Sequence, residues 1–170
     1  NINDGVGSQY PEGLAGLVTE HRANLGIAHD GDADRLVLVD EKGSVLDGDE
    51  LMAIVARNAL SKGELRSDTL VATVQSNRGL KVALESWGGR VVQTSVGDRY
   101  VVETMLEGGY SIGGESSGHL IFMDILPSGD GLVAALKVIE AMLESGTPLS
   151  ELRKCLERFP QVVRALNVAE

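Results

Sequence analysis

Short apolar runs alternate with amphipathic stretches along the chain, and this alternation predicts an α/β protein. Two β-like runs, at 25–29 and 36–40, flank an acidic loop and are followed by a turn through Gly43. Further strands are expected at 69–74, 90–96, 110–113, 120–123 and 159–163, and helices at 50–60, 78–87, 98–106 and 130–144, with a shorter helix after Pro148. Strands separated by helices of this length are typical of α/β units.

The polar stretch 61–68, which contains Gly63, predicts a boundary between two α/β domains. The first domain is expected to span residues 1–65 and the second residues 66–165. Asp49 and Asp98 are the expected N-caps of the helices that follow them, because an aspartate oxygen can accept hydrogen bonds from the first free amides.

Composition and charge exclude several classes of protein. The net charge of −10 over 170 residues argues against a nucleic-acid partner, because phosphate backbones require clustered lysine and arginine. The single cysteine, Cys155, excludes an internal disulfide framework and agrees with a reducing, cytoplasmic compartment. No apolar run approaches the roughly 20 residues of a membrane span. The start of the chain has neither a signal-peptide pattern nor an initiating Met, so it is expected to lie inside a longer chain.

The segment HDGDADR at 29–35 carries the clearest chemical signal. Its carboxylates, Asp30, Asp32 and Asp34, alternate with small residues, and a curled backbone can direct all three toward one point. Carboxylates packed this closely repel one another unless a cation or protons compensate them, and hard oxygen ligands select magnesium, manganese or calcium. Arg35 adds a cationic fork suited to a phosphate beside the metal.

Two other interpretations of this loop stay open. One is a solvated acidic turn. The other is a calcium-binding EF-hand loop, in which Asp30 would be position 1 and Glu41 position 12. However, Arg35 stands where an EF-hand needs glycine, and the flanking segments are β-like rather than helical.

The second signal is the glycine-rich segment 113–122, GGESSGHLIF. Glu115 can accept two hydrogen bonds and Ser117 can donate or accept one, which suits them to sugar hydroxyls. His119 could act as an acid, a base or a phosphate donor. A β-hairpin loop with a structural histidine explains this segment equally well.

Taken together, these segments resemble the α-D-phosphohexomutase superfamily. The resemblance rests on DGDADR, TSVGDRYV at 94–101, GESSGH at 114–119 and PSGDG at 127–131, and it covers essentially the whole chain. INDGVGS at 2–8 and FPQV near the end are most similar to the phosphoglucosamine mutase branch. The resemblance implies two consecutive α/β domains with mixed sheets, the second, metal-binding domain and the third, sugar-binding domain of a four-domain enzyme built around a cleft.

The resemblance also implies roles for individual residues. Asp30, Asp32 and Asp34 would hold one Mg²⁺ ion, and Arg35 would contact phosphate. Glu115 and Ser117 would bind the sugar hydroxyls, with His119 near the reacting groups. The active cleft would also include three residues from TSVGDRYV: Gly97, Asp98 and Arg99.

The implied reaction interconverts a hexose 6-phosphate, expected to be glucosamine phosphate, and its 1-phosphate through a phosphoserine. No TASHNP-like serine motif occurs in the chain, so this segment alone is expected to be inactive, to need the other domains as partners and to favour self-association as a homodimer. A phosphoglucomutase or phosphomannomutase fragment is the alternative within the superfamily. Outside it, the alternatives are a non-catalytic module that binds metal and sugar phosphate, and a calcium-binding interaction protein.

Overall fold

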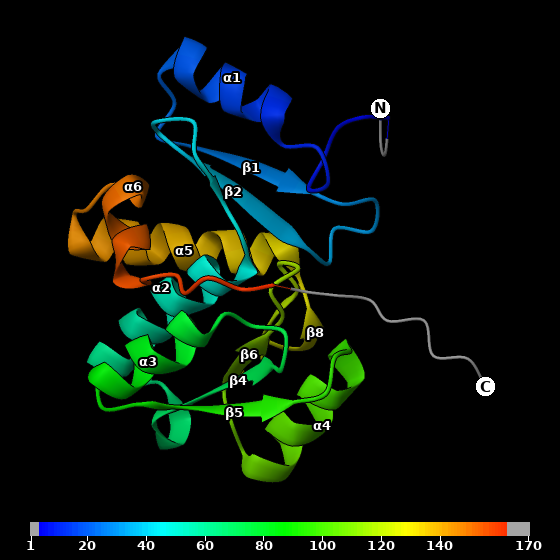
Figure 1. Ribbon diagram of the computed structural model, residues 1–170, viewed down its shortest axis with the longest axis vertical. Coiled ribbons are helices and arrows are strands. Elements are labelled where there is room, and N and C mark those ends of the chain that lie inside the picture. Colours follow the sequence, from blue (N-terminus) through cyan, green and yellow to red (C-terminus); the bar gives the residue numbers. More distant parts are fainter. Residues whose placement is uncertain (1–3, 163–170) are drawn as a thin grey trace.

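The computed structural model describes residues 4–162, which form two β-sheets with helices packed on both (Figure 1). The first sheet is antiparallel, in the order β1-β2-β3. Its strands are β1 (Leu25–His29), β2 (Leu36–Asp40) and β3 (Val45–Leu46). Helix α1 (Glu12–His21) packs on β1 and β2, and α5 (Gly131–Ser145) also contacts β2.

The second sheet is mixed and has the order β5-β4-β6-β7-β8. Strands β5, β4 and β6 are parallel, whereas β7 and β8 run antiparallel to their neighbours. The strands are β4 (Thr69–Thr73), β5 (Arg90–Thr94), β6 (Ile112–Gly114), β7 (Leu120–Phe122) and β8 (Leu126–Gly129). The remaining helices are α2 (Gly48–Ser61), α3 (Arg78–Ser86), α4 (Asp98–Gly108), α6 (Leu149–Leu152) and the short 3-10 helices η1 (Arg66–Asp68) and η2 (Arg153–Cys155).

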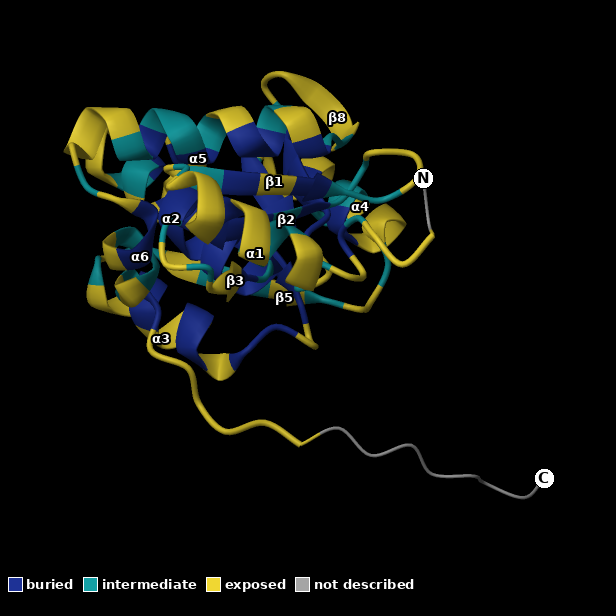
Figure 2. Cartoon of the chain, turned by 90° about the horizontal axis from the view of Figure 1, so that it is seen from above, coloured by how far each residue is buried: buried dark blue, intermediate teal, exposed yellow. Residues whose placement is uncertain are grey.

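Strand β4 is buried on both faces, as expected for a central strand covered by helices. Leu70 and Ala72 belong to the main core, whereas Val71 points to the opposite face and packs with Val101 and Met105 of α4. The main core runs without interruption from β2 through α2 to β7 and α5. In Figure 2 the buried segments lie beneath α5 and extend into α2. The two sheets therefore share one hydrophobic core, which fixes the loops of one relative to the loops of the other.

Helix α1 is the largest element that the sequence pattern does not predict. Its ten residues include Gly13 and Gly16, which lower intrinsic helix propensity. The helix forms because it packs on β1, where Val18 is buried against Gly26. A Cβ atom at Gly26 would lie only 2.6 Å from Cγ2 of Val18. Tertiary packing thus outweighs a weak local preference.

Strand β8 is also absent from the sequence prediction. It contains Pro127, which lacks an amide proton and argues against a central strand. The structure places it at the edge of the sheet, where a missing donor is tolerated.

Both predicted helix caps are wrong by one or two residues. Helix α2 is capped by Asp47 rather than Asp49, in a reciprocal capping box. The Glu50 amide donates to Oδ1 of Asp47, and the Asp47 amide donates to Oε2 of Glu50, both at 3.2 Å. Helix α4 begins after Gly97, and Asp98 is its first residue.

The predicted strand at 159–163 is wrong over residues 159–162, which have no regular secondary structure; Val163 lies outside the described residues. This segment is held instead by the side chain of Asn77, the N-cap of α3. Oδ1 of Asn77 accepts from the Phe159 amide at 3.0 Å, and its Nδ2 donates to the Phe159 carbonyl at 2.8 Å. None of the helices within residues 4–162 is long and apolar enough to cross a membrane.

Candidate active site: an acidic loop and a glycine-rich loop

Both loops singled out by the sequence are tips of β-hairpins. The β1–β2 register pairs His29 with Leu36, so residues 30–35 form the first tip, the acidic loop. The β6–β7 register pairs Gly114 with Leu120, so residues 115–119 form the second tip, called the sugar loop after the role that the resemblance implies. The backbone of each loop is thus fixed at both ends by a strand.

The acidic loop brings its three carboxylates together, as the sequence predicts. Asp30, Asp32 and Asp34 each offer an oxygen, and these atoms lie within 4.8 Å of one another. Ala33 adopts a positive φ of 61°, which curls the loop between two of the aspartates. The Arg35 amide donates to Oδ1 of Asp30 at 3.2 Å, and the Arg35 Nε lies 3.6 Å from Asp30 Oδ2.

The acidic loop rests on the N-terminus of α5. The Gly131 amide donates to the Ala33 carbonyl at 2.9 Å, and Nδ1 of His29 lies 3.0 Å from the Arg35 carbonyl oxygen. A Cβ atom at Gly131 would lie 2.5 Å from that His29 nitrogen, so only glycine fits this approach. The positive end of the α5 dipole also favours the negative charge of the loop.

Asp34 is the carboxylate that most needs a cation. Its Oδ1 is buried and has no hydrogen-bond partner within the described part of the chain. Burial, followed by the influence of the neighbouring Asp30 carboxylate, raises the pKa of Asp34 above its ordinary value. An unpartnered buried oxygen among three carboxylates fits a hard divalent cation such as Mg²⁺.

The sugar loop is fastened to both halves of the molecule by its backbone. The Leu36 amide of β2 donates to the Gly118 carbonyl at 3.0 Å, and the Gly48 amide of α2 donates to the Ser116 carbonyl at 3.1 Å. Within the loop, Ser117 is exposed and Glu115 is partly buried. Oε1 of Glu115 accepts from the Gly97 amide at 2.9 Å, so two predicted site segments touch.

These segments meet at the carboxyl ends of parallel strands. Residues 74–77 follow β4, residues 95–98 follow β5, and the sugar loop follows β6. From β4 the chain passes to β5 on one side and then returns to β6 on the other side of β4, so the connections change direction there. Open α/β sheets bind ligands at such a switch point. Asp98 is exposed there, whereas Nε of Arg99 is engaged by Glu103 at 2.8 Å along the surface of α4.

His119 is placed differently from a freely accessible acid or base. It is only 6% exposed, and its Nδ1 lies 3.0 Å from Oδ2 of Asp34. The residues that position the acidic loop, His29 and Gly131, were not singled out from the sequence. The PSGDG segment at 127–131, which ends in Gly131, is the one signal in the sequence that could have pointed to this residue.

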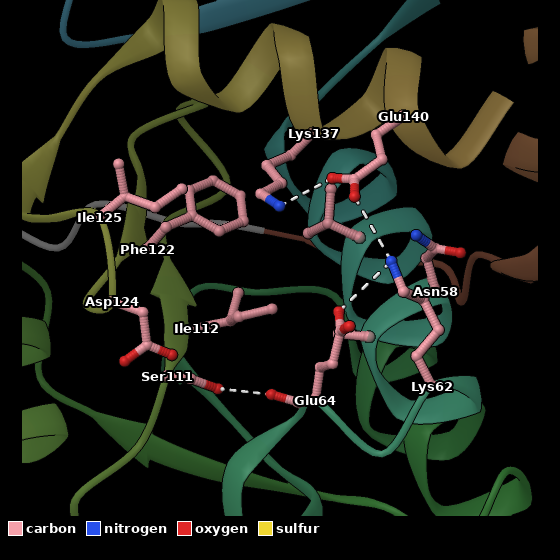
Figure 3. A pocket seen from close by; sticks show the side chains of 12 residues that line it. Asn58, Lys62, Glu64, Ser111, Ile112, Phe122, Asp124, Ile125, Lys137 and Glu140 are labelled. Carbon is pink, nitrogen blue, oxygen red and sulfur yellow. Dashed lines mark hydrogen bonds and ion pairs between the residues drawn. The ribbon is translucent and has the colours of Figure 1, made fainter. Parts of the chain in front are cut away.

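Several cavities among the described residues are lined by neither loop. One of them, about 110 Å³, is at the opposite end of the sheet, next to Ser111 just before β6 (Figure 3). Its two lysines are paired with carboxylates: Lys62 pairs with Glu64 and Glu140, and Lys137 pairs with Glu140. Another, about 510 Å³, opens beside the residues that follow β4 and includes the cationic side chains of Arg78 and Lys81.

Residues 47–159 match the family model described as Phosphoglucomutase/phosphomannomutase, alpha/beta/alpha domain III. The chain belongs to this family. The match begins at Asp47, the N-cap of α2, and covers the whole second sheet together with the sugar loop. The α/β architecture predicted from the sequence is therefore confirmed as that of a middle domain of the phosphohexomutases. The second sheet is mixed, as expected, whereas the first sheet is antiparallel throughout.

Curated relatives extend the similarity over all 170 residues. The chain is 54% identical to a phosphoglucosamine mutase of Anaeromyxobacter dehalogenans and 51% identical to one of Bacillus subtilis, in each case over its full length. It spans 37% and 38% of the length of these two proteins. Among solved structures, a putative phosphomannomutase from Thermus thermophilus matches with a TM-score of 0.78 and 26% identity, over 86% of this chain and 33% of that one.

Proposed function

We propose that these residues form the metal-binding and sugar-binding part of a phosphoglucosamine mutase, which interconverts glucosamine 6-phosphate and glucosamine 1-phosphate. The observation that carries the proposal is the direct joining of the two loops. The acidic loop gathers three carboxylates, and the sugar loop lies against it through the Leu36–Gly118 and Asp34–His119 contacts.

The relatives support the choice of substrate. Eight curated relatives that are 51–55% identical to this chain carry the name phosphoglucosamine mutase. One structural neighbour of the same fold, an Aspergillus fumigatus N-acetylphosphoglucosamine mutase, was solved in complex with GlcNAc-6P and magnesium. Glucose and mannose phosphates are the competing substrates, because the matching family model is that of phosphoglucomutases and phosphomannomutases.

Asp30, Asp32 and Asp34 are proposed to hold one Mg²⁺ ion, and the unpartnered Oδ1 of Asp34 fits this role. The ion would offset negative charge on the transferred phosphoryl group, where catalysis of phosphoryl transfer mainly acts. Arg35, partly exposed beside Asp30, can donate to a phosphate oxygen.

The sugar loop is proposed to orient the substrate. The carboxylate of Glu115, already fixed by the Gly97 amide, keeps lone pairs free to accept from sugar hydroxyls. Ser117 is exposed at the tip, so its hydroxyl can reach a ligand in the crevice. Asp98 and Arg99 complete the proposed rim, and a phosphoserine supplied from outside these 170 residues would act as the nucleophile.

The division into two domains also remains a proposal. Helix α2 packs on α3 and α5, and its Gly48 amide donates to the sugar loop. The family match also begins at residue 47. We therefore place the boundary just before α2 rather than near residue 65.

A chimera tests the function directly. This chain replaces the equivalent 170-residue segment of the Bacillus subtilis phosphoglucosamine mutase, and conversion of glucosamine 6-phosphate to the 1-phosphate is measured with Mg²⁺ and a bisphosphate activator. The chimera is expected to be active and to prefer glucosamine phosphate over glucose and mannose phosphates. A folded chimera that turns over only glucose or mannose phosphate would contradict the proposed substrate.

The same chimera tests the two loops separately. Asp32→Asn is expected to reduce kcat, whereas Glu115→Gln and Ser117→Ala are expected to raise KM, since each loses hydrogen bonds worth roughly 0.5–3 kcal/mol. Glu107→Gln, an equal charge change at an exposed position of α4, is the matched control. Full activity in all three loop variants would make both loops structural and refute the assignment.

A further inference from the structure

Gly97 lies in the turn that joins β5 to α4, at the same edge of the second sheet as the sugar loop. Its φ of 128° and ψ of 133° belong to a region that residues with a side chain rarely adopt. A Cβ atom at Gly97 would lie 3.4 Å from the ring of Tyr100, which is an ordinary contact. The backbone conformation, rather than crowding, is therefore what requires glycine here, and this conformation decides where the Gly97 amide points.

Helix α4 holds the Gly97 amide in place. The Gly97 carbonyl accepts from the amides of Tyr100 at 3.0 Å and Val101 at 3.3 Å, at the first turn of the helix. The helix packs on β4 and β6, so the turn is attached to the centre of the sheet. Gly97 also lies at the positive end of the α4 dipole, which favours a carboxylate as the partner of its amide.

The carboxylate of Glu115 is that partner. Its Oε1 accepts from the Gly97 amide at 2.9 Å. Because β4 lies between β5 and β6, which are therefore about 10 Å apart, this hydrogen bond crosses the end of β4. The backbone of Glu115 is fixed as well, since its amide donates to the His119 carbonyl at 2.9 Å and its carbonyl accepts from the Gly118 amide at 3.0 Å. The side chain of Glu115 is thus held at both ends.

This arrangement leaves the second carboxylate oxygen of Glu115 for a ligand. Oε2 makes no hydrogen bond to the residues that the structure describes, whereas Oε1 is engaged. An ionised carboxylate only accepts hydrogen bonds, so Oε2 offers its lone pairs to hydroxyl donors in a fixed direction. An unrestrained glutamate would lose side-chain entropy on binding, and a glutamate that is already oriented avoids that loss.

From these contacts we propose that Gly97 is a positioning residue for the substrate. Its amide orients the carboxylate of Glu115, and it acts on the sugar through that carboxylate. The proposal rests on the proposed function, in which the sugar loop binds the hexose phosphate. A hydrogen bond to a charged acceptor is among the stronger ones, so its loss is expected to weaken substrate binding by about 10- to 100-fold.

The test is a double-mutant cycle in the Bacillus subtilis chimera. Gly97→Ala is expected to raise KM for glucosamine 6-phosphate by about 10- to 100-fold, with kcat within about twofold of the wild type. In a Glu115→Ala background the same change is expected to alter KM by less than about twofold, because the group through which Gly97 acts is gone. Gly109→Ala is the matched control: Gly109, at the other end of α4, also has a positive φ, of 66°, and open space at Cβ.

The contact itself is tested in the 170-residue chain with ¹⁵N-labelled glycine. Glu115→Ala is expected to shift the nuclear magnetic resonance signal of the Gly97 amide and to speed the exchange of its proton with deuterated water. The Gly109 amide donates to the Leu106 carbonyl at 3.4 Å and is expected to keep its signal. This measurement does not depend on substrate or activity.

Each outcome decides the matter. An unchanged KM in a folded Gly97→Ala chimera overturns the proposal, and so does a rise in KM that is equally large with and without Glu115. If Gly97→Ala does not fold, an unchanged Gly97 amide signal in Glu115→Ala overturns it. If the wild-type chimera folds but turns over no hexose phosphate, the proposed function is wrong and the role of Gly97 falls with it. A raised KM that disappears in the Glu115→Ala background, with Gly109→Ala unaffected, supports the proposal.

Discussion

Replacing Arg153 with Met is expected to lower the free energy of unfolding by about 3–5 kcal/mol, because it leaves two buried carboxylates without a cation. The Arg153 guanidinium lies 3.1 Å from Oδ2 of Asp40 and 2.7 Å from Oε1 of Glu50. It also donates to the Val45 carbonyl at 2.9 Å. The side chains of Asp40 and Glu50 are only 2% and 8% exposed, so water cannot replace the lost partner.

The measurement is urea denaturation of the wild type and of Arg153→Met, followed by circular dichroism. Lys154→Met is the matched control, because the neighbouring Lys154 pairs with Glu151 at 2.6 Å on the surface, where such a pair contributes about 0–1 kcal/mol. Adding Glu50→Gln to Arg153→Met should recover part of the loss, since one uncompensated charge is removed. A loss of less than about 1 kcal/mol in Arg153→Met, similar to the control, would refute the argument.

The pH dependence gives a second readout of the same change. Burial raises the pKa of Glu50, and the hydrogen bond and charge of Arg153 oppose that rise. Without Arg153 the folded-state pKa rises further, while the pKa in the unfolded chain is unchanged. The variant's deficit should therefore be largest at neutral pH and should shrink as the pH falls through the folded-state pKa of Glu50, where the protonated side chain needs no cation.

Three further predictions concern the loops and the cysteine. Gly131→Ala should lower both the melting temperature and the Mn²⁺ affinity, because the new methyl group would lie 2.5 Å from Nδ1 of His29. The control is Gly63→Ala, which has open space at Cβ and should leave the Mn²⁺ affinity unchanged. Because the pKa of Asp34 is raised, the metal-free chain should gain stability from this group as the pH falls through that pKa; the rise in melting temperature caused by Mg²⁺ should shrink over the same range and be lost in Asp34→Asn. Burial raises the pKa of Cys155 to about 11, so its alkylation by iodoacetamide at pH 8 should be slow in the folded chain and fast in urea.

The sequence predicts the elements whose pattern and packing agree. Strand β4 has three consecutive apolar residues between two threonines and is buried on both faces, and α5 has an apolar side that joins the core, so the sequence predicts both within a few residues of their observed bounds. Helix α1 escapes prediction because its stability comes from contact with β1 rather than from its own residues. The segment that begins at Phe159 is apolar enough to suggest a strand, yet the backbone of Phe159 is bound by the side chain of Asn77. Local composition does not show that a distant side chain, rather than a neighbouring strand, binds this backbone.

The candidate site is predictable in its parts and not in its assembly. The three aspartates and the glycine-rich loop stand out in the sequence because each carries its chemistry within a few residues. The contact that joins them, between Asp34 and His119, spans 85 residues and connects hairpins of two different sheets. Periodicity says nothing about such a pair, so the sequence indicated that His119 matters without indicating what it touches.

The glycines explain how two loops of unrelated sheets can form one site. The chain contains 21 glycines, more than an average composition predicts. Several of them lie where two segments come into close contact. Gly48 lies against the backbone of the sugar loop, Gly118 lies against Leu36 of β2, and Gly131 lies against the acidic loop and His29. At each of these contacts a backbone amide or carbonyl makes the connecting hydrogen bond, so the side chains of Ser117 and Asp32 are not consumed in holding the loops together, and Glu115 uses only Oε1, for the Gly97 amide. Side chains freed in this way remain available to the proposed cation and sugar, and a purely structural pair of hairpins would not need them to be free.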